Sequence, residues 1–388
     1  MKKYFYIGLF LLLLTEVVKA YYLMPMPGSQ EQSHLPLVYF LYSKRWLLRI
    51  IFGLMMIAGL KDVFQRRKWI PVIFLLIATA GIYMADHMMS ADVMFKETDH
   101  LVLKPKAENK VNDSSLVLCV KNGDEVRAYP IQFIYYHHKV YDTIAGQPLI
   151  ITYCSVCRTG MVYIPEIKKQ PAKFRLVGMQ HYNAMFEDEE TKSWWAQESG
   201  ECIAGPLKGE MLPVFPSRQM TLEKAFELYP SLLVMQADEK YLNGYDTDRA
   251  FETGKIRTGI ERTDSVSWKE KSWVIGITVD TLSRAYDWIE LKQHKIIQDK
   301  LGNKYFVIMI AGNEQDYIVA ETGSFIHPII KNINDTISIT DEGKEEKYNF
   351  DGESYSGNVP DLHIIPSKQE FLHSWENFHP HSSRYKFP

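Results

Sequence analysis

Cys154 and Cys157 stand two residues apart in the stretch ITYCSVCRTGMVY (151–163), and this spacing is suited to sulfur chemistry. Such a pair can form a small, strained disulfide ring, and the first thiol becomes more acidic when local donors stabilise its thiolate. Arg158 follows at once, and a guanidinium near the sulfur would lower the thiol pKa. The pattern therefore favours dithiol redox chemistry, in which one cysteine attacks and the other resolves.

Metal binding and a structural turn are the two alternatives for the same cysteines. A tetrahedral zinc site usually takes its ligands from two such loops, and the sequence contains one C-x-x-C motif. The side chains that could complete a metal site are Cys119, Cys202 and His181 for zinc, and Met161 or Met179 for copper. No spacing signature supports either set. We therefore identify no cofactor, and a metal site built on Cys154, Cys157, His181 and Cys202 remains the second hypothesis.

The elements around the pair indicate a turn between two strands. LIITY (149–153) is a continuous apolar, β-branched run, which is typical of a strand buried on both faces. The run Met161 to Ile164 on the other side is also strand-like. A thioredoxin fold would place the pair at the start of a helix, so this context disfavours it.

Composition excludes some functions and locates a membrane-facing region. The chain has 388 residues, a formal net charge of -3 and four cysteines, which are too few for a disulfide scaffold of this length. No Lys/Arg stripe occurs outside the flanks of the first apolar segments, so nucleic acid is not an expected partner. The long apolar runs lie between Met1 and Ala85, and we expect a membrane part followed by a soluble part.

Three apolar segments predict a membrane anchor over residues 1–85. The first begins after Met1-Lys2-Lys3 and would be either a signal peptide cleaved near Val18-Lys19-Ala20 or an uncleaved span reaching Met24; we favour the span because further spans follow. The segments 46–60 and 69–85 read as two more helices, the first weakened by Arg49.

Charge at the ends of these segments predicts their orientation. The basic block at 65–68 (QRRK) belongs in the cytoplasm by the positive-inside rule, which leaves residues 86–388 outside the bacterial cytoplasmic membrane. Lys44 and Arg45 oppose this orientation unless residues 37–49 lie along the membrane interface. A redox partner protein outside the cell membrane would then be the expected partner.

An internal repeat dominates residues 86–388. Residues 116–153 align without a gap on residues 273–310 at an offset of 157, and residues 215–230 resemble residues 365–380 at an offset of 150. The identical pairs in the first alignment are Val117/Val274, Arg127/Arg284, Ala128/Ala285, Tyr129/Tyr286, His137/His294, Asp142/Asp299 and Ile151/Ile308. The sequence therefore indicates a duplication of whole domains.

Each copy predicts a strand-dominated α+β module. The first contains a hairpin with its turn at Asn122-Gly123, a short helix over 131–138, the strand at 149–153 and a helix that ends at Tyr229-Pro230. We predict three parts: an anchor (1–85), a first module with the cysteines (90–240) and a second module (241–388).

The second copy bears on the role of the cysteines. Ala311 and Glu314 occupy the positions that match Cys154 and Cys157. The fold can therefore be built without the pair, which argues against a purely structural role. The shared Arg127 and His137 are expected to serve packing and hydrogen bonding instead.

The segment after the pair supplies candidate substrate-binding residues. MFEDEETKSWWAQESGECIAGPLKGEML (185–212) reads either as a strand, a turn over 188–191 and a buried tryptophan, or as one wall of a cleft. In the second interpretation Asp188, Trp195 and Gln197, with Tyr153, contact the substrate. Cys202 reads as a buried strand residue.

The order of these motifs resembles a known bacterial family. LCVKNGDEVRAYP, ITYCSVCRTGMVY, the run from Asp188 to Trp195 with Gln197, and GPLKGEML together are similar to the domain-of-unknown-function family 3179 over roughly residues 90–388. Some members are described as selenoproteins with selenocysteine near the C-x-x-C motif. The resemblance implies redox work at Cys154 or Cys157, since a selenol is chiefly useful as a low-pKa nucleophile.

This chain departs from the family pattern within the loop. Relatives more often show Cys-Pro-Leu-Cys-Gly, whereas Ser155-Val156 and Arg158 stand in those places here. The resemblance therefore leaves the loop's stiffness, and with it the disulfide potential, to be measured. A membrane-anchored scaffold without catalysis is the third hypothesis, and the enzyme class remains an expectation of thiol–disulfide oxidoreductase type.

Overall fold

Residues 166–212 fold together with the N-terminal helices. The computed structural model describes residues 1–388 except 66–67, 246–248, 251, 253–265 and 326–327. It consists of a first unit, residues 1–96 with 166–212, and a second unit, residues 97–165 with 213–388. This division differs from the three consecutive parts expected from the sequence, because residues 166–212 belong to the same unit as the N-terminal helices.

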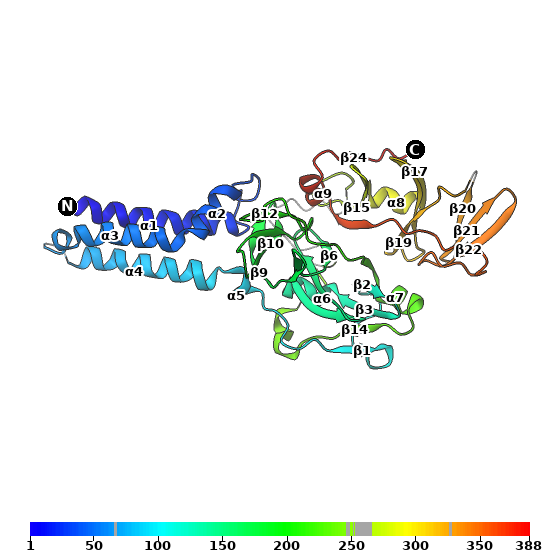
Figure 1. Cartoon of the computed structure of the whole chain (residues 1–388), viewed down its shortest axis with the longest axis horizontal. Coiled ribbons are helices and arrows are strands. Elements are labelled where there is room, and N and C mark those ends of the chain that lie inside the picture. Colours follow the sequence, from blue (N-terminus) through cyan, green and yellow to red (C-terminus); the bar gives the residue numbers. More distant parts are fainter. Residues whose placement is uncertain (66–67, 246–248, 251, 253–265, 326–327) are drawn as a thin grey trace. The chain divides into compact units, whose positions relative to one another are not determined.

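The N-terminal part of the first unit is helical. Its elements are α1 (Lys2–Leu23), α2 (Leu35–Ser43), α3 (Arg45–Val63), α4 (Trp69–Tyr83), the π-helical η1 (Met84–Met88) and α5 (Ala91–Met94). Figure 1 shows α1, α3 and α4 side by side. Two segments, Lys2–Leu23 and Trp69–Met88, are long and apolar enough to cross a membrane. The basic residues Arg66 and Arg67, which carry the predicted orientation, lie outside the described residues.

Glycines bring α1 and α3 into close contact. A Cβ atom added at Gly59 would lie 2.7 Å from the Phe5 nitrogen, and one added at Gly8 would lie 2.7 Å from the Phe52 carbonyl oxygen. Small residues that allow two backbones to approach are the usual means of packing helices in a bilayer. Gly53 on α3 has nothing within 4 Å.

Charged side chains lie inside this helical group, where apolar ones are expected in a water-soluble bundle. Lys19 Nζ is 2.6 Å from Glu16 Oε2 and 2.9 Å from Asp86 Oδ1. Arg49 Nη2 is 2.7 Å from Glu16 Oε1, and Arg49 Nη1 is 2.8 Å from Asp86 Oδ2. The four charges cancel, and the cluster gives Arg49, which weakened the segment 46–60 in the sequence, two carboxylate partners.

Strands complete the first unit. They are β7 (Glu166–Ile167), β8 (Gln170–Pro171), β9 (Phe174–Gln180), β10 (Asn183–Asp188), β11 (Trp194–Ala196) and β12 (Cys202–Ala204). The last four form an antiparallel sheet in the order β12-β11-β10-β9.

The second unit begins with a module that carries the cysteines, which we call the first module. Its elements are β1 (Leu103–Pro105), η2 (Lys106–Glu108), β2 (Leu116–Asn122), β3 (Glu125–Pro130), α6 (Ile131–His137), β4 (Lys139–Ile144), β5 (Gln147–Cys154), β6 (Thr159–Tyr163), β13 (Arg218–Thr221), α7 (Leu222–Leu228), β14 (Leu233–Met235) and η3 (Glu239–Gly244). Its sheets have the orders β1-β14-β3-β2-β13 and β4-β5-β6.

The second module contains the remaining elements. They are β15 (Trp273–Val279), β16 (Leu282–Asp287), α8 (Trp288–His294), β17 (Ile296–Leu301), β18 (Lys304–Ile310), β19 (Tyr317–Glu321), β20 (Ile329–Ile333), β21 (Thr336–Asp341), β22 (Lys344–Tyr348), β23 (Ser367–Phe371), α9 (Leu372–Phe378) and β24 (Ser383–Arg384). Its sheets have the orders β23-β15-β16-β24, β17-β18-β19 and β20-β21-β22. The strand-rich α+β class predicted from the sequence is confirmed.

Strand pairing in the two modules follows one register. Val117 faces Pro130 and Val274 faces Asp287, which are the same positions at the sequence offset of 157. The pairs Lys139/Thr152 and Tyr153/Gly160 recur as Ile296/Met309 and Ile310/Tyr317. The pairs Cys119/Arg218 and Arg127/Leu233 recur as Gly276/Lys368 and Arg284/Ser383, where the second partner follows the other offset, of 150. Both sequence offsets therefore have a counterpart in hydrogen-bonded pairing.

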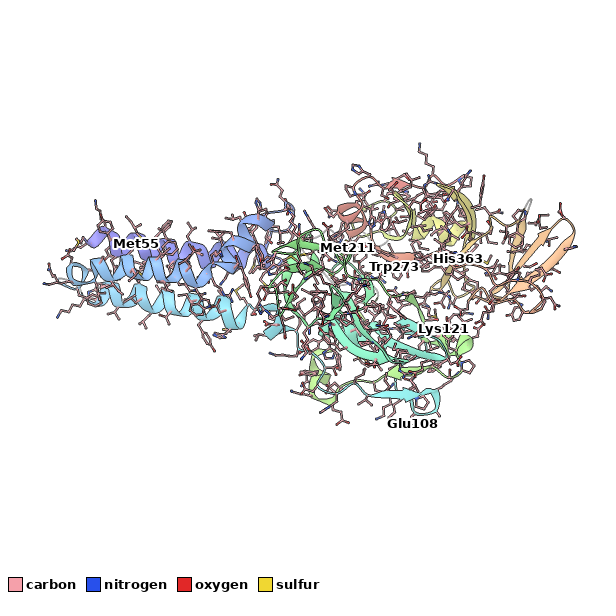
Figure 2. The ribbon with its side chains drawn as sticks, in the orientation of Figure 1. Met55, Glu108, Lys121, Met211, Trp273 and His363 are labelled. Carbon is pink, nitrogen blue, oxygen red and sulfur yellow. The ribbon has the colours of Figure 1, made fainter. Side chains whose placement is uncertain are left out.

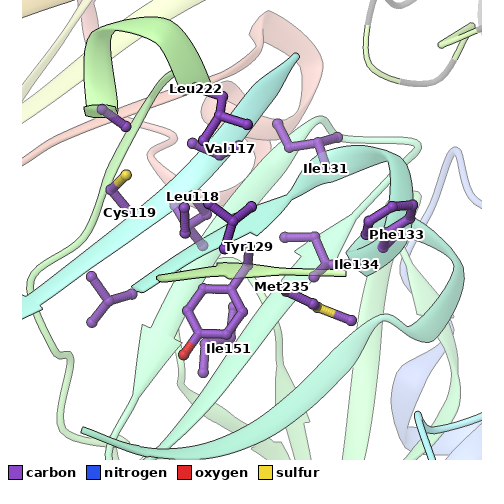
Figure 3. Close-up of a cluster of buried hydrophobic side chains, with 14 of the residues drawn as sticks. Val117, Leu118, Cys119, Tyr129, Ile131, Phe133, Ile134, Ile151, Leu222 and Met235 are labelled. Carbon is purple, nitrogen blue, oxygen red and sulfur yellow. The ribbon is translucent and has the colours of Figure 1, made fainter. Parts of the chain in front are cut away.

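Buried side chains of β2, β3, α6, β5 and α7 form the core of the first module (Figure 3). Tyr129 belongs to this core, and its hydroxyl donates to Asp142 Oδ2 at 2.6 Å. The matching Tyr286 donates to Asp299 Oδ2 at 2.5 Å. The tyrosine holds β3 against β4 in the first module, and β16 against β17 in the second, through one partly buried hydrogen bond each.

The two modules hold each other through matching segments. Thr159 Oγ1, in the first module, donates to Glu370 Oε2 of β23 at 2.9 Å. In the opposite direction the backbone N–H of Thr221 donates to Asp316 Oδ1 at 2.6 Å, and its hydroxyl donates to Asp316 Oδ2 at 2.7 Å. The turn before β6 thus docks on β23, and the turn before β19 docks on β13.

We predict that Gly59→Leu separates α1 from α3, because the new side chain meets the backbone of Phe5 and Met1. Overpacking at such a contact costs about 1–3 kcal/mol. The measurement is thermal unfolding of the purified chain in detergent, followed by circular dichroism. Gly53→Leu is the matched control on the same helix, and equal destabilisation by the two variants would contradict the close packing.

Candidate functional site

The two cysteines lie at the tight connection between β5 and β6. Cys154 is the last residue of β5 and faces Thr159, the first residue of β6. Cys157 lies in the intervening turn, which Arg158 closes with a φ of +53°. Both cysteine side chains are fully buried. The turn between strands that the sequence predicted is present.

Segments of the second module cover this turn. The backbone N–H of Phe371 donates to the Cys157 carbonyl oxygen at 2.9 Å. His373 Nε2 lies 3.4 Å from the Val156 carbonyl oxygen. The side chain of Thr159 reaches the Glu370 carboxylate, as described above. β23 and α9 therefore form one wall of the site.

Burial sets the chemistry of the Cys157 thiol. Burial raises the pKa of Cys157 well above its usual value, and hydrogen bonding to Cys154 and the charge of Glu370 act in the same direction. The Ser374 hydroxyl opposes the shift by hydrogen bonding to the sulfur. The thiol is consequently protonated at neutral pH, whereas the sequence had suggested an acidified cysteine.

Arg158 has a different role from the one expected beside a thiolate. Its guanidinium carbon lies 3.5 Å from the centre of the Trp273 ring and 5.3 Å from that of Phe371. Its Nη2 donates to the Glu252 carbonyl oxygen. The cation thus packs on an aromatic face, donates to a backbone oxygen and contacts the Tyr153 hydroxyl. It links the turn to β15 and to the segment that contains Glu252.

Tyr153 lies in the core of the first module. Its side chain is fully buried, and burial raises the pKa of its hydroxyl. Its backbone pairs twice with His138: Tyr153 N–H donates to the His138 carbonyl oxygen at 3.0 Å, and His138 Nδ1 lies 2.9 Å from the Tyr153 carbonyl oxygen. His138 therefore fixes the end of β5, one residue before Cys154.

The other predicted substrate-binding residues belong to the first unit and hold its sheet. Asp188 accepts hydrogen bonds from Thr191 N–H at 2.5 Å, Ser193 N–H at 3.0 Å and Trp195 Nε1 at 3.0 Å. Gln197 Oε1 accepts from Asn183 Nδ2 at 3.0 Å. Asp188, Trp195 and Gln197 are buried. This geometry matches the turn and buried tryptophan that the sequence offered as its first interpretation.

The predicted metal ligands are divided between the two units. Cys154 and Cys157 lie in the second unit, and His181 and Cys202 lie in the first. Cys202 is buried, donates to the Ala204 carbonyl oxygen at 3.4 Å and has a pKa raised to about 11 by burial. Within the described residues, no group of three or more His, Cys, Asp or Glu side chains is arranged to hold a metal ion.

Sequence reasoning missed Glu370 and Ser374. The offset of 150 aligns Glu370 with Met220, a buried apolar residue of β13. A carboxylate in a position that is apolar in the other copy is a usable signal, because a charge is buried only where it has a partner. The role of this carboxylate can be inferred only when β23 is known to contact the turn that contains the cysteines.

Comparison with known protein families assigns most of the chain to one family. The family described as "Protein of unknown function (DUF3179)" matches residues 98–382. The chain belongs to this family. The match begins after the helices α1–α5 and includes the sheet of β9–β12, the first module and the second module up to α9. Comparisons with curated proteins and with solved structures found no match.

We predict that His138 makes stability depend on pH. Burial lowers its pKa to about 4, assisted by the neighbouring His137. The unfolded chain, with a histidine pKa near 6.5, therefore binds the proton more readily, so stability is full above about pH 6.5 and falls as the pH drops towards 4. Between pH 7.5 and 4.5 this histidine should account for about 2.5 kcal/mol.

The matched variant is His138→Asn, because asparagine tolerates the positive φ of 55° and can donate to the Tyr153 oxygen. Chemical unfolding followed by tryptophan fluorescence should give a smaller loss between pH 7.5 and 4.5 in this variant. The same loss in both proteins would show that other groups carry the dependence.

Proposed function

We propose that this DUF3179 protein is a membrane-anchored thiol–disulfide protein that reacts through Cys154 and Cys157. The observation that carries the proposal is the contact of the two thiols with each other, beside the buried carboxylate of Glu370. A carboxylate next to a protonated thiol is a local proton acceptor, which a cysteine with a raised pKa needs before it can attack. The second module has Ala311 and Glu314 in place of the pair.

The proposed reaction transfers two electrons from the protein to a disulfide of a partner protein. Glu370 accepts the proton of one cysteine, and that thiolate attacks one sulfur of the partner disulfide and displaces the other as a thiolate. The second cysteine then attacks the mixed disulfide and releases the second partner thiolate. The protein ends with a Cys154–Cys157 disulfide, and the two cysteine protons pass to the partner thiols.

Access to the sulfurs requires movement of the turn. Both sulfurs are fully buried, and Ser155 is 7% exposed. The turn is held by the Phe371 and His373 contacts. We therefore expect the separation of residues 155–158 from β23 and α9 to limit the reaction with a protein disulfide.

We predict that wild-type protein shows one two-electron couple with a potential above about -300 mV, the range of structural disulfides lying below that. Cys154→Ser and Cys157→Ser should each abolish the couple and keep the wild-type unfolding temperature, since the second module folds without the pair. Cys202→Ser is the control and should keep the couple. The measurement is equilibration in dithiothreitol buffers, alkylation and mass spectrometry.

Three results would overturn the redox proposal. Unfolding of both variants would make the pair structural, and so would a potential below about -300 mV. A stoichiometric content of zinc or copper in protein purified without chelator would favour metal binding at the same cysteines.

We also propose that α1, α3 and α4 anchor the protein in the membrane. Large apolar side chains face outward on each helix, including Phe10 (63% exposed), Ile57 (65%) and Leu76 (65%). The charged residues Glu16 and Lys19 face inward. An apolar exterior around paired charges suits lipid and would be unfavourable in water.

The proposed orientation places residues 86–388 on the exoplasmic side, in line with the positive-inside rule for the block 65–68. We predict that proteinase K removes a C-terminal tag from the full chain in intact bacterial spheroplasts. A cytoplasmic tagged protein is the control and should be cut only after lysis. Protection of the tag until lysis would reverse the orientation.

We further propose that the two modules arose by tandem duplication. The common register at constant sequence offsets supports this proposal, since unrelated hairpins have no reason to share it over five pairs of strands. On this view the cysteine pair, or its loss, distinguishes two copies of one ancestral unit.

A further inference from the structure

A cavity of about 610 Å³ lies where the two modules meet. Its walls come from residues 118–121, 160–161 and 214–219 of the first module and 276–278, 317–319 and 363–369 of the second. These segments correspond at the offsets of 157 and 150. Lys121 and His363, labelled in Figure 2, belong to the two sides of the wall. The volume is in the range that holds a small organic ligand.

Two equivalent glutamines meet in the wall of this cavity. Gln219 Nε2 donates to Gln369 Oε1 at 3.0 Å, and the two positions are related by the offset of 150. Gln369 is only 5% exposed, and its Nε2 has no hydrogen-bond partner among the described residues. A buried donor without an acceptor is unfavourable, so this amide group is a ready point of attachment for a ligand oxygen.

The two modules have side chains of different size at matching positions near the cavity. In the second module Trp375 packs on Gly276, where an added Cβ would lie 2.1 Å from the ring. The matching residues in the first module are Cys119 and Ala225. Ala225 is buried in the core of the first module, whereas Trp375 lines the cavity. The Cys119 side chain, which is buried, borders the cavity on this side.

The wall cations Lys121 and Arg218 are paired with acidic side chains: Lys121 Nζ lies 3.2 Å from Glu353 Oε1, and both cations contact Asp351. The cations among the described lining residues are Lys121, Arg218 and Lys368, and the carboxylate is that of Asp351. Asp351 is shared, since its oxygens lie 3.2 Å from Lys121 Nζ and 2.6 Å from Arg218 Nη1. Apolar side chains such as Leu118, Met161 and Ile318 supply much of the remaining wall.

We propose that this cavity binds a small apolar carboxylic acid, with its chain beside Cys119 and a carboxylate oxygen accepting a hydrogen bond from Gln369 Nε2. An amine with the same chain is an ammonium at neutral pH and has no acceptor for the Gln369 Nε2 donor, so it should not bind in this way. This cavity is separate from the site of the proposed redox chemistry, because neither Cys154 nor Cys157 lines it.

The first test is calorimetry of the full chain in lipid nanodiscs, with empty nanodiscs subtracted. The probes are octanoate and octylamine, which share the apolar chain and differ in the sign of the head group. Octanoate should bind once per chain, and octylamine should not. Gln369→Met, which keeps the length of the side chain, should weaken octanoate binding at least about tenfold, the effect expected on losing a hydrogen bond to a charged group.

Gln298→Met is the matched control, because Gln298 is exposed on β17 and does not line the cavity. It should bind octanoate as the wild type does. Equal binding of octylamine, or full octanoate binding by Gln369→Met, would overturn the proposal.

A second measurement uses wild-type protein and so does not depend on the folding of a variant. Octanoate should slow alkylation of Cys119 by N-ethylmaleimide, measured by peptide mass spectrometry, and should leave the rate at Cys202 unchanged. Octanoate binding without protection of Cys119 would place the ligand elsewhere and would also overturn the proposal.

Discussion

The reciprocal docking of two turns is the constraint on which the second unit depends. The turn with Cys154 and Cys157 meets β23 of the second module through the bond from Thr159 to Glu370, and the turn with Asp316 meets β13 of the first through Thr221. Each module therefore supplies the surface that closes the other's hairpin. A buried carboxylate takes part on both sides, and each has a hydroxyl donor within 2.9 Å. Because a buried charge is tolerated only with such partners, the two modules are each incomplete alone.

This arrangement shows how one fold could carry the proposed redox chemistry in one module only. The hairpins β5–β6 and β18–β19 have the same register, so the backbone conformation around the cysteines does not require cysteine side chains. The carboxylates differ in placement: Asp316 is in the turn itself, whereas Glu370 comes from the opposite module. In the module with the cysteines, the turn itself therefore contains no acidic residue, and the second module supplies the carboxylate. Because Glu370 lies on a separate strand, the distance between its carboxylate and the sulfurs would change if the turn moved.

Sequence alone predicted the strand-rich class and the place of the cysteines in a turn, because both rest on local signals. Alternation, Asn122-Gly123 and the two constant offsets require no knowledge of long-range contacts. The surroundings of the sulfurs could not be predicted in this way. Arg158 is adjacent in sequence and yet turns to Trp273, while Glu370 lies in the other module, far along the chain from Cys157, and acts on its pKa. For Asp188 and Trp195 the sequence allowed both a turn with a buried tryptophan and a cleft wall, and their hydrogen bond lies within their own sheet.

The raised pKa of Cys157 also follows from the docking and has a consequence for reactivity. A fully buried thiol beside a carboxylate is a poor nucleophile while the site is closed, since burial and the neighbouring charge both disfavour the thiolate. In the proposed reaction, proton transfer to Glu370 would remove the charge that opposes the thiolate, and separation of the turn from β23 would then hydrate the sulfur. The same movement exposes the sulfurs to a partner disulfide. In the proposed reaction, reactivity and access would therefore be coupled through one structural change, and the closed site would protect the pair from indiscriminate oxidation.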